Sequence, residues 1–122
     1  MNMYVVIGAI LGAIALGTYA QAEQKLQKLN GAQIRTKIAG MELTDRIHWR
    51  EFYEHSGRVT SNSMGRKRTG KWRVEKDQLC VEYDKEPPVK CYEVWSSGKS
   101  VELKAEGLLP LEGVIESPTG RK

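Results

Sequence analysis

Apolar and polar residues follow three different patterns along this 122-residue chain. Residues 4–17 form one apolar run without a charged residue. Ile34 and Ile38 then stand four positions apart in a polar stretch, a spacing that places both on one face of a helix. From residue 46 onward the period becomes two, with turn residues at short intervals, which predicts a succession of antiparallel strands.

The short helix is predicted over residues 31–39, and both of its ends carry suitable signals. Asn30 and Gln33 have the spacing of a capping-box variant, in which side chains and backbone N–H groups bond reciprocally. Gly40 stands where a chain commonly leaves a helix in a left-handed conformation. A helix with only two apolar residues on one face has to pack against another element, most simply a sheet.

The predicted strands are the alternating segments between turn residues. They lie around residues 47–53, 58–61, 72–74, 79–83, 89–95, 101–103 and 111–116. Residues 62–68 are predicted to form a polar tip, and residues 84–87 a four-residue loop. The aromatic residues of 44–55 also have helical spacing, but a strand is favoured there. The predicted fold is therefore mainly β, an antiparallel meander of six or seven short strands, as an open sheet or a small barrel, behind one short helix.

The first 22 residues contain no Asp, Glu, Lys or Arg and end in Ala20-Gln21-Ala22. This pattern predicts a signal peptide over residues 1–22, cut between Ala22 and Glu23, and hence a periplasmic or secreted protein. Because no Lys or Arg precedes the apolar core, an uncleaved N-terminal membrane anchor is the alternative. The rest is predicted to comprise a polar tether (23–29), a single small β-rich domain (30–116) and a flexible tail (117–122).

Cys80 and Cys91 are the two cysteines of the chain. An even number in an exported protein favours a disulfide, because no second cysteine pair for zinc and no C-x-x-C redox motif is present. If Cys80 and Cys91 are opposed across a hairpin, Tyr83 lies opposite Pro88. Residues 84–87 then form a four-residue loop, which is a common length for a hairpin. Closing a loop of this size stabilises a fold by roughly 3 kcal/mol.

Charge is unevenly distributed along the chain, whose formal net charge is +4. Residues 58–76 carry seven cations and one acid, a net charge of +6, whereas residues 77–116 carry nine acids and four cations, a net charge of −5. The sharpest cationic feature is a predicted basic hairpin with five cations: Arg66, Lys67, Arg68, Lys71 and Arg73.

Such a basic hairpin can contact anionic lipid headgroups, an acidic polymer or an acidic protein face. A solvated tip that protects a sheet edge from aggregation is the structural alternative. Nucleic acid is a disfavoured partner for an exported protein. The three tryptophans Trp49, Trp72 and Trp95 are predicted core residues, and the alternative is that they line a pocket for a small apolar ligand.

The sequence contains no complete catalytic or cofactor-binding motif. His48, Glu51 and His55 share a face only on a helix, where they could bind a divalent ion; on a strand the two histidines face opposite sides. Residues 65–71 begin like a phosphate-binding loop but continue with Trp72 in place of Ser or Thr. No G-x-S-x-G elbow is present. We therefore expect a non-enzymatic protein without a metal or cofactor.

The order of several segments resembles a loose group of small exported bacterial proteins of unknown function, including the DUF995-like type. The segments are Leu29-Asn-Gly-Ala-Gln-Ile34, Trp49-x-x-Phe-Tyr53 with Ser56-Gly57, Gly70-Lys-Trp72-Arg-Val74, Leu79-Cys80 and Cys91. The resemblance covers about residues 29–103. It implies an exported protein with a short helix and antiparallel strands, and it implies no activity.

The expected function is that of a small exported binding or cell-envelope accessory domain that contacts an anionic partner through the basic hairpin. Two alternatives remain open from the sequence. One is a carrier of a small apolar ligand with a pocket between helix and sheet, and the other is a proteinaceous inhibitor of an envelope enzyme.

Overall fold

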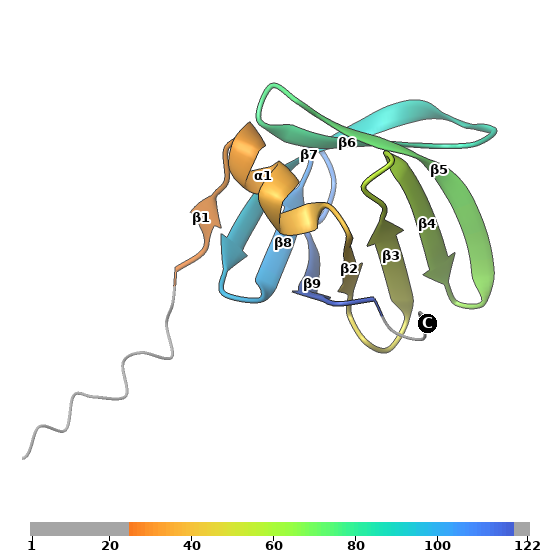
Figure 1. Cartoon of the computed structure of the whole chain (residues 1–122), viewed down its shortest axis with the longest axis horizontal. Coiled ribbons are helices and arrows are strands. Elements are labelled where there is room, and N and C mark those ends of the chain that lie inside the picture. The colour runs from red at the N-terminus through yellow and green to blue at the C-terminus, as the bar shows by residue number, and fades with distance from the viewer. Residues whose placement is uncertain (1–24, 119–122) are drawn as a thin grey trace, which may run out of the picture.

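A computed structural model of the protein describes residues 25–118, which form a closed antiparallel β-barrel of eight strands with one helix (Figure 1). The elements in chain order are β1 (Gln27–Lys28), α1 (Gly31–Ile38), β2 (Met41–Thr44), β3 (Trp49–Tyr53), β4 (Arg58–Ser63), β5 (Arg66–Glu75), β6 (Gln78–Tyr83), β7 (Glu86–Ser97), β8 (Ser100–Lys104) and β9 (Leu111–Glu116). The prediction of a mainly β chain with one short helix is confirmed, and the sheet takes the barrel form.

Strands β2 to β9 follow one another around the barrel, and β9 pairs with β2 to close the sheet. β7 pairs with three strands: residues 86–92 pair with β6, residues 93–97 pair with β8, and residues 95–96 also pair with β1. Among the described residues, 86–92 have no strand on their second side. Pro87 and Pro88 lie there and lack backbone N–H groups, which protects this edge from pairing with another molecule.

The turns alternate between the two ends of the barrel, because neighbouring strands run in opposite directions. Turns 54–57, 76–77 and 98–99 lie at the end where α1 packs, which we call the helix end. The turns 45–48, 64–65, 84–85 and 105–110 lie at the opposite end, which we call the rim.

The predicted capping box of α1 is confirmed. The Gln33 backbone N–H donates to the Asn30 side chain at 2.9 Å, and the Asn30 N–H donates to the Gln33 side chain at 2.8 Å. Ile34 and Ile38 are fully buried, so the apolar face of the helix packs against the barrel interior. These two side chains occupy the space between helix and sheet.

Polar contacts fix α1 over the turns of the helix end. The Gly31 N–H donates to the Asp77 carboxylate at 2.7 Å, in the β5–β6 turn. Lys37 Nζ donates to the Gly98 carbonyl at 2.6 Å, in the β7–β8 turn. In Figure 1 the helix accordingly lies across the barrel, with strands on both sides of it.

The barrel interior is a single hydrophobic core. Its buried residues are Ile34, Ile38, Leu43, Tyr53, Val59, Trp72, Leu79, Val81, Val94, Val101, Leu103 and Ile115. Tyr53 and Trp72 contact each other edge to face, with ring centroids 5.8 Å apart, a favoured geometry for aromatic pairs. The polar side chains that share the interior are described with the candidate site.

The structure contains a strand that the pattern does not predict. β2 has four residues, of which only Met41 and Leu43 face the core, so its alternation is too short to detect. Hydrogen bonding to β3 on one side and β9 on the other determines its conformation. Thr44 is buried although it faces away from the core, because its hydroxyl donates to the Trp49 carbonyl at 2.6 Å.

Two predicted loops are wrong in extent. Residues 62–68 do not form a polar tip: β4 and β5 continue through them, and only Met64 and Gly65 form the turn. The 84–87 loop is also shorter, because Tyr83 pairs with Glu86 and a register irregularity lies between Val81 and Tyr83. The opposition of Tyr83 and Pro88 is therefore wrong, whereas Cys80 opposes Cys91 as predicted.

Part of the predicted tether (23–29) belongs to the folded domain. Residues 27–28 form β1 on the side of β7, and Leu29 packs against the core. The predicted signal peptide and its cleavage site between Ala22 and Glu23 lie outside the described residues. Within residues 25–118, no helix has the length and apolar character needed to cross a membrane.

Candidate functional site

The five cations of the predicted basic hairpin lie on two faces of β5. Because side chains alternate along a strand, Arg66 and Arg68 face the same side as the core residue Trp72. Lys67, Lys71 and Arg73 face the outside of the barrel. The basic hairpin is therefore not one continuous cationic tip.

The acidic last third of the chain offsets one of the two charges of the inner pair. Arg66 and Arg68 both contact Glu86 of β7, at 3.4 Å and 3.2 Å. The Arg68 guanidinium also lies 4.0 Å from the centroid of the Tyr83 ring, a cation–π contact. These contacts make the inner pair part of the barrel framework.

Two of the outer cations, Lys71 and Arg73, line a groove of about 520 Å³ on the wall of the barrel. Its lining residues are Ser56, Gly57, Arg58, Thr69, Gly70, Lys71, Trp72, Arg73 and Asp84. Arg58 lies directly opposite Lys71 in the β4–β5 ladder. We call Arg58, Lys71 and Arg73 with this groove the cationic groove.

The ion pairs of the cationic groove are few and exposed. Arg73 pairs with Glu75 of its own strand, and Arg58 lies 3.6 Å from Glu54. In the described chain, Lys71 forms no ion pair, although Glu82 stands opposite it on β6. Exposed pairs contribute little to stability, so these cations remain accessible to an external anion.

Close backbone approach produces the floor of the groove. A Cβ on Gly70 would overlap the Glu82 carbonyl oxygen and lie 2.7 Å from Tyr83 Cα, so only glycine fits where β5 passes β6. The Trp72 N–H donates to the Gly57 carbonyl at 2.8 Å, which joins the β3–β4 turn to β5. These contacts fix the positions of the β3–β4 turn, β5 and β6 relative to one another beneath the cations.

A second polar cluster lies inside the barrel around Glu51. The hydroxyls of Tyr53 and Tyr83 donate to the two carboxylate oxygens of Glu51 at 2.7 Å and 2.5 Å. Burial, together with the nearby Glu51 charge, raises the pKa of Tyr53 and of Tyr83 well above the ordinary tyrosine range. The same two causes raise the pKa of Tyr92.

The Glu51 cluster joins β3 to β6 across the barrel and holds a carboxylate with two phenols. Sequence reasoning missed it, because Glu51 was considered as a metal ligand together with His48 and His55. Strand parity in β3, β6 and their partners is the signal that would have found the cluster.

The three tryptophans lie in different environments. Trp72 is buried, and its indole N–H donates to the Glu54 carbonyl at 2.8 Å. Trp49 is half-buried and packs against the core. Trp95 faces outward, where its indole N–H donates to Glu93 at 3.1 Å and the Lys104 ammonium lies over its ring. The three indoles do not meet around one cavity.

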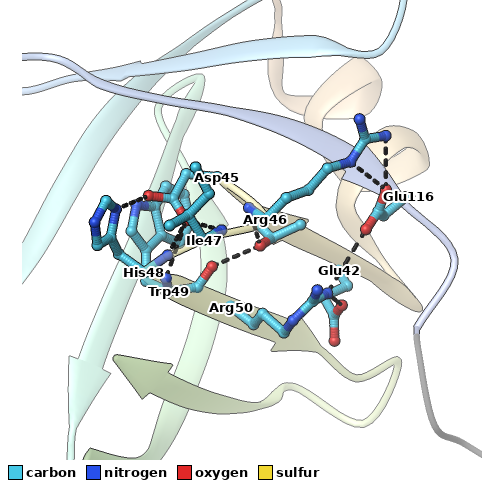
Figure 2. Close-up of polar contacts among 9 residues, drawn as sticks. Glu42, Asp45, Arg46, Ile47, His48, Trp49, Arg50 and Glu116 are labelled. Carbon is cyan, nitrogen blue, oxygen red and sulfur yellow. Dashed lines mark hydrogen bonds and ion pairs between the residues drawn. The ribbon is translucent and has the colours of Figure 1, made fainter. Parts of the chain in front are cut away.

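The two histidines flank β3 at its opposite ends, and Glu51 lies between them on the strand. Among residues 25–118, no group of three His, Cys, Asp or Glu side chains is placed to hold a metal ion. His48 instead contacts Asp45, with 2.8 Å between Nδ1 and the carboxylate (Figure 2).

Asp45 organises the β2–β3 turn of the rim. Its carboxylate accepts hydrogen bonds from the backbone N–H groups of Ile47, His48 and Trp49 at 2.6 to 3.0 Å (Figure 2). Desolvation alone would raise the pKa of Asp45, but these donors outweigh it and hold the pKa below its usual range.

An ion-pair network lies beside this turn on the outer surface. Arg46 contacts Glu116 at 3.0 Å, and Arg50 contacts Glu42 at 2.6 Å and Glu116 at 3.6 Å (Figure 2). The network spans β2, β3 and β9, which are the strands that close the barrel. We assign it a structural role at the closure.

The disulfide between Cys80 and Cys91 is confirmed. It joins β6 to β7 at directly opposed positions, and the Cys80 side chain is fully buried. A disulfide is compatible with an oxidising compartment.

Comparison of the chain with protein-family models, with curated proteins and with solved structures finds no significant match. The resemblance to the DUF995-like group therefore stays a prediction.

Proposed function

We propose that the protein is an exported, non-enzymatic binding domain whose cationic groove binds anionic groups of a cell-envelope partner. The groups in question are phosphates or carboxylates, because guanidinium and ammonium donors bind both. The groove offers these donors together with the hydroxyl of Ser56, whereas the hydroxyl of Thr69 donates to Asp84, the one acid among the lining residues.

The observation that carries this proposal is the direct opposition of Arg58 and Lys71 in the β4–β5 ladder. Like charges at opposed positions of a sheet destabilise it. Neither the fold nor the register needs cations at these two exposed positions. A bound anion would remove the repulsion, so the pair favours binding at some expense of stability.

Binding of fluorescently labelled polyphosphate, followed by anisotropy, tests the proposal. We expect the Arg58→Ser/Lys71→Ser double variant to bind about tenfold more weakly than the wild type. Wild-type binding should also weaken as ionic strength rises, because salt screens exposed charges. Lys99→Ser is a control at an exposed lysine in the β7–β8 turn, and it should change the affinity little.

Equal affinity of the wild type and the double variant would contradict the proposal. Loss of affinity in Lys99→Ser as large as in the double variant would also contradict it, since net charge and not the groove would then explain binding. Urea unfolding of each variant would exclude misfolding as the cause.

The exported state is tested by the intact mass of protein purified from cells that express the full chain. We expect a mass that begins at Glu23 and rises by two hydrogens on reduction of the Cys80–Cys91 disulfide. A full-length mass with free thiols would contradict export with cleavage, and it would favour the alternative of an N-terminal anchor.

A further inference from the structure

The exposed apolar side chains gather at one end of the barrel. Within residues 25–118, the large hydrophobic residues that are exposed are Ile47 (81%), Met64 (77%), Leu108 (54%), Leu109 (89%) and Leu111 (41%). All five belong to the rim or to the strand residue next to it, and the helix end has none. Single exposed apolar residues are common in proteins, but their confinement to one end is not expected by chance.

The turns that carry these residues follow one another in the order of strands around the barrel. The Met64 N–H donates to the His48 carbonyl at 2.9 Å, so the turns that carry Ile47 and Met64 are adjacent. On the other side, Thr44 pairs with Val114 in the β2–β9 ladder. β9 follows the loop that carries Leu108 and Leu109, so in the order of strands around the barrel the β8–β9 loop comes directly before the β2–β3 turn.

Met64 has an unfavourable local conformation for its residue type. It has a φ of +53°, and Gly65 follows with a φ of +83°, so the two form a turn in which Asn-Gly is the favoured pair. Methionine gains nothing from this backbone conformation, and its side chain is 77% exposed, so it gains little from packing. Contact with something outside the molecule would explain its presence there.

Cations flank the apolar residues of the rim. Arg46 precedes Ile47, Lys67 follows Met64 by three residues, and Lys85 lies in the β6–β7 turn. Among the described residues, the ammoniums of Lys67 and Lys85 have no ion pair. Three of the nearby acids are engaged: Asp45 holds its own turn, Glu86 binds two arginines, and Asp84 accepts from Thr69 at 3.1 Å. Glu106 and Glu112, beside the leucines of the β8–β9 loop, are exposed and form no ion pair among the described residues, so the cationic side of the rim is the side of the β4–β5 and β6–β7 turns.

We propose that the rim docks on an anionic lipid bilayer, with Ile47, Met64 and Leu109 inserted at the boundary between headgroups and acyl chains. Apolar side chains on separate turns suit a fluid surface, which adapts to each of them, and free ammoniums next to them suit anionic headgroups. This inference goes beyond the cationic groove, which lies on the barrel wall and binds independently.

Vesicle flotation tests the proposal. The chain used begins at Glu23, because it keeps every strand and every core residue of the barrel but lacks the apolar run of residues 4–17. The vesicles consist of phosphatidylcholine alone or of phosphatidylcholine with an equal amount of phosphatidylglycerol. We expect the wild type to partition onto both, with several-fold stronger partitioning onto the anionic vesicles.

Three variants separate the contributions. Ile47→Gln/Met64→Asn/Leu109→Gln leaves the net charge unchanged and should lower partitioning onto both vesicles by about tenfold or more. Lys67→Gln/Lys85→Gln should remove most of the anionic preference only. Ala32→Gln/Thr36→Gln, on the exposed face of α1, should partition like the wild type. Met64→Asn alone supplies the residue that the turn favours, so its loss of partitioning cannot come from misfolding.

A wild type that does not float, or a triple variant that floats as well as the wild type, would overturn the proposal. Partial loss in Met64→Asn alone would support it. Arg58→Ser/Lys71→Ser gives an independent reading: if this variant loses polyphosphate binding but floats normally, groove and rim are separate sites. If it floats normally and also keeps polyphosphate binding, the proposed function fails while docking of the rim stands.

Discussion

At the scale of single residues, the Glu51 cluster is the contact that ties the barrel interior together. A carboxylate in a protein interior is unfavourable unless it is hydrogen-bonded, and here two phenols satisfy both oxygens. Tyr53 is fully buried, so its hydroxyl depends on Glu51 for a partner. The cluster therefore makes stability depend on the protonation of the tyrosines.

The first prediction is that the protein loses stability in alkali. In the fold the pKa values of Tyr53 and Tyr83 are raised, whereas an unfolded tyrosine loses its proton near pH 10. Above about pH 10 the unfolded chain therefore binds fewer protons than the fold, and stability falls as pH rises. Below that pH the contribution is fully present. Urea unfolding at a series of pH values from 8 upward measures it.

Tyr53→Phe and Tyr83→Phe provide the control for this prediction. Each variant removes one group with a raised pKa, so the loss of stability above pH 10 should become less steep. Each should also destabilise the fold at neutral pH by about 1.5–3 kcal/mol, because a hydrogen bond to a charged group is lost. An unchanged slope in both variants would show that other groups cause the alkaline loss.

At the scale of elements, β5 and β6 pass so close together that one residue of β5 must be glycine. We predict that Gly70→Ala destabilises the protein by at least about 2 kcal/mol, because the added Cβ overlaps backbone atoms that cannot rotate away. Thr60→Ala, on the neighbouring strand, should change stability by only about 0.5 kcal/mol. Urea unfolding of both measures the difference, and equal midpoints would show that the strands can separate at Gly70.

The second element is α1, whose stability depends on its capping box. Asn30→Ala removes the side-chain acceptor of the capping box and leaves the Gln33 N–H without its partner. We predict a loss of about 1 kcal/mol in the free energy of unfolding. Thr36→Ala lies on the same helix but keeps the caps, so it should not destabilise. Thermal unfolding followed by circular dichroism would measure both, and a stable Asn30→Ala variant would contradict the prediction.

These elements show which parts of the fold the sequence predicts. The helix, its capping box and the Cys80–Cys91 pairing are local signals, and each is confirmed. β2 is not predictable in the same way, because its conformation depends on β3 and β9, which lie on both sides of it. Residues 62–63 and 66–68 are strand despite their polar composition, because a closed barrel pairs them with neighbours whatever their hydropathy.

The candidate site is predictable in composition but not in arrangement. The sequence identifies the cations of β5, but strand parity sends Arg66 and Arg68 to one face and Lys71 and Arg73 to the other. Arg58 joins the groove only through the β4–β5 register. The apolar rim has no signal along the chain, because its members come from three separate turns.

At the scale of the whole molecule, folding brings the basic and acidic segments of the chain together. Residues 58–76 carry a net charge of +6 and residues 77–116 a net charge of −5, and β5 and β6 from these segments are neighbours in the barrel. Arg66 and Arg68 meet Glu86 one strand farther on. Much of the uneven charge along the sequence is therefore balanced between neighbouring strands of the fold. The cations of the cationic groove are those that remain accessible.

The disulfide acts on the whole barrel, because β7 links the half of the sheet that contains β6 to the half that contains β8. Residues 86–92 pair only with β6 in the described chain, so Cys80–Cys91 secures a segment that has one neighbour instead of two. We predict that Cys80→Ala/Cys91→Ala lowers the free energy of unfolding by about 3 kcal/mol. For a domain of this size, that corresponds to a fall in Tm of about 10 to 20 °C. Differential scanning calorimetry of the wild type, the wild type with a reductant and the double variant measures it. The reduced wild type and the double variant should agree, and a Tm that is independent of the disulfide would show that hydrogen bonding to β6 alone holds this segment.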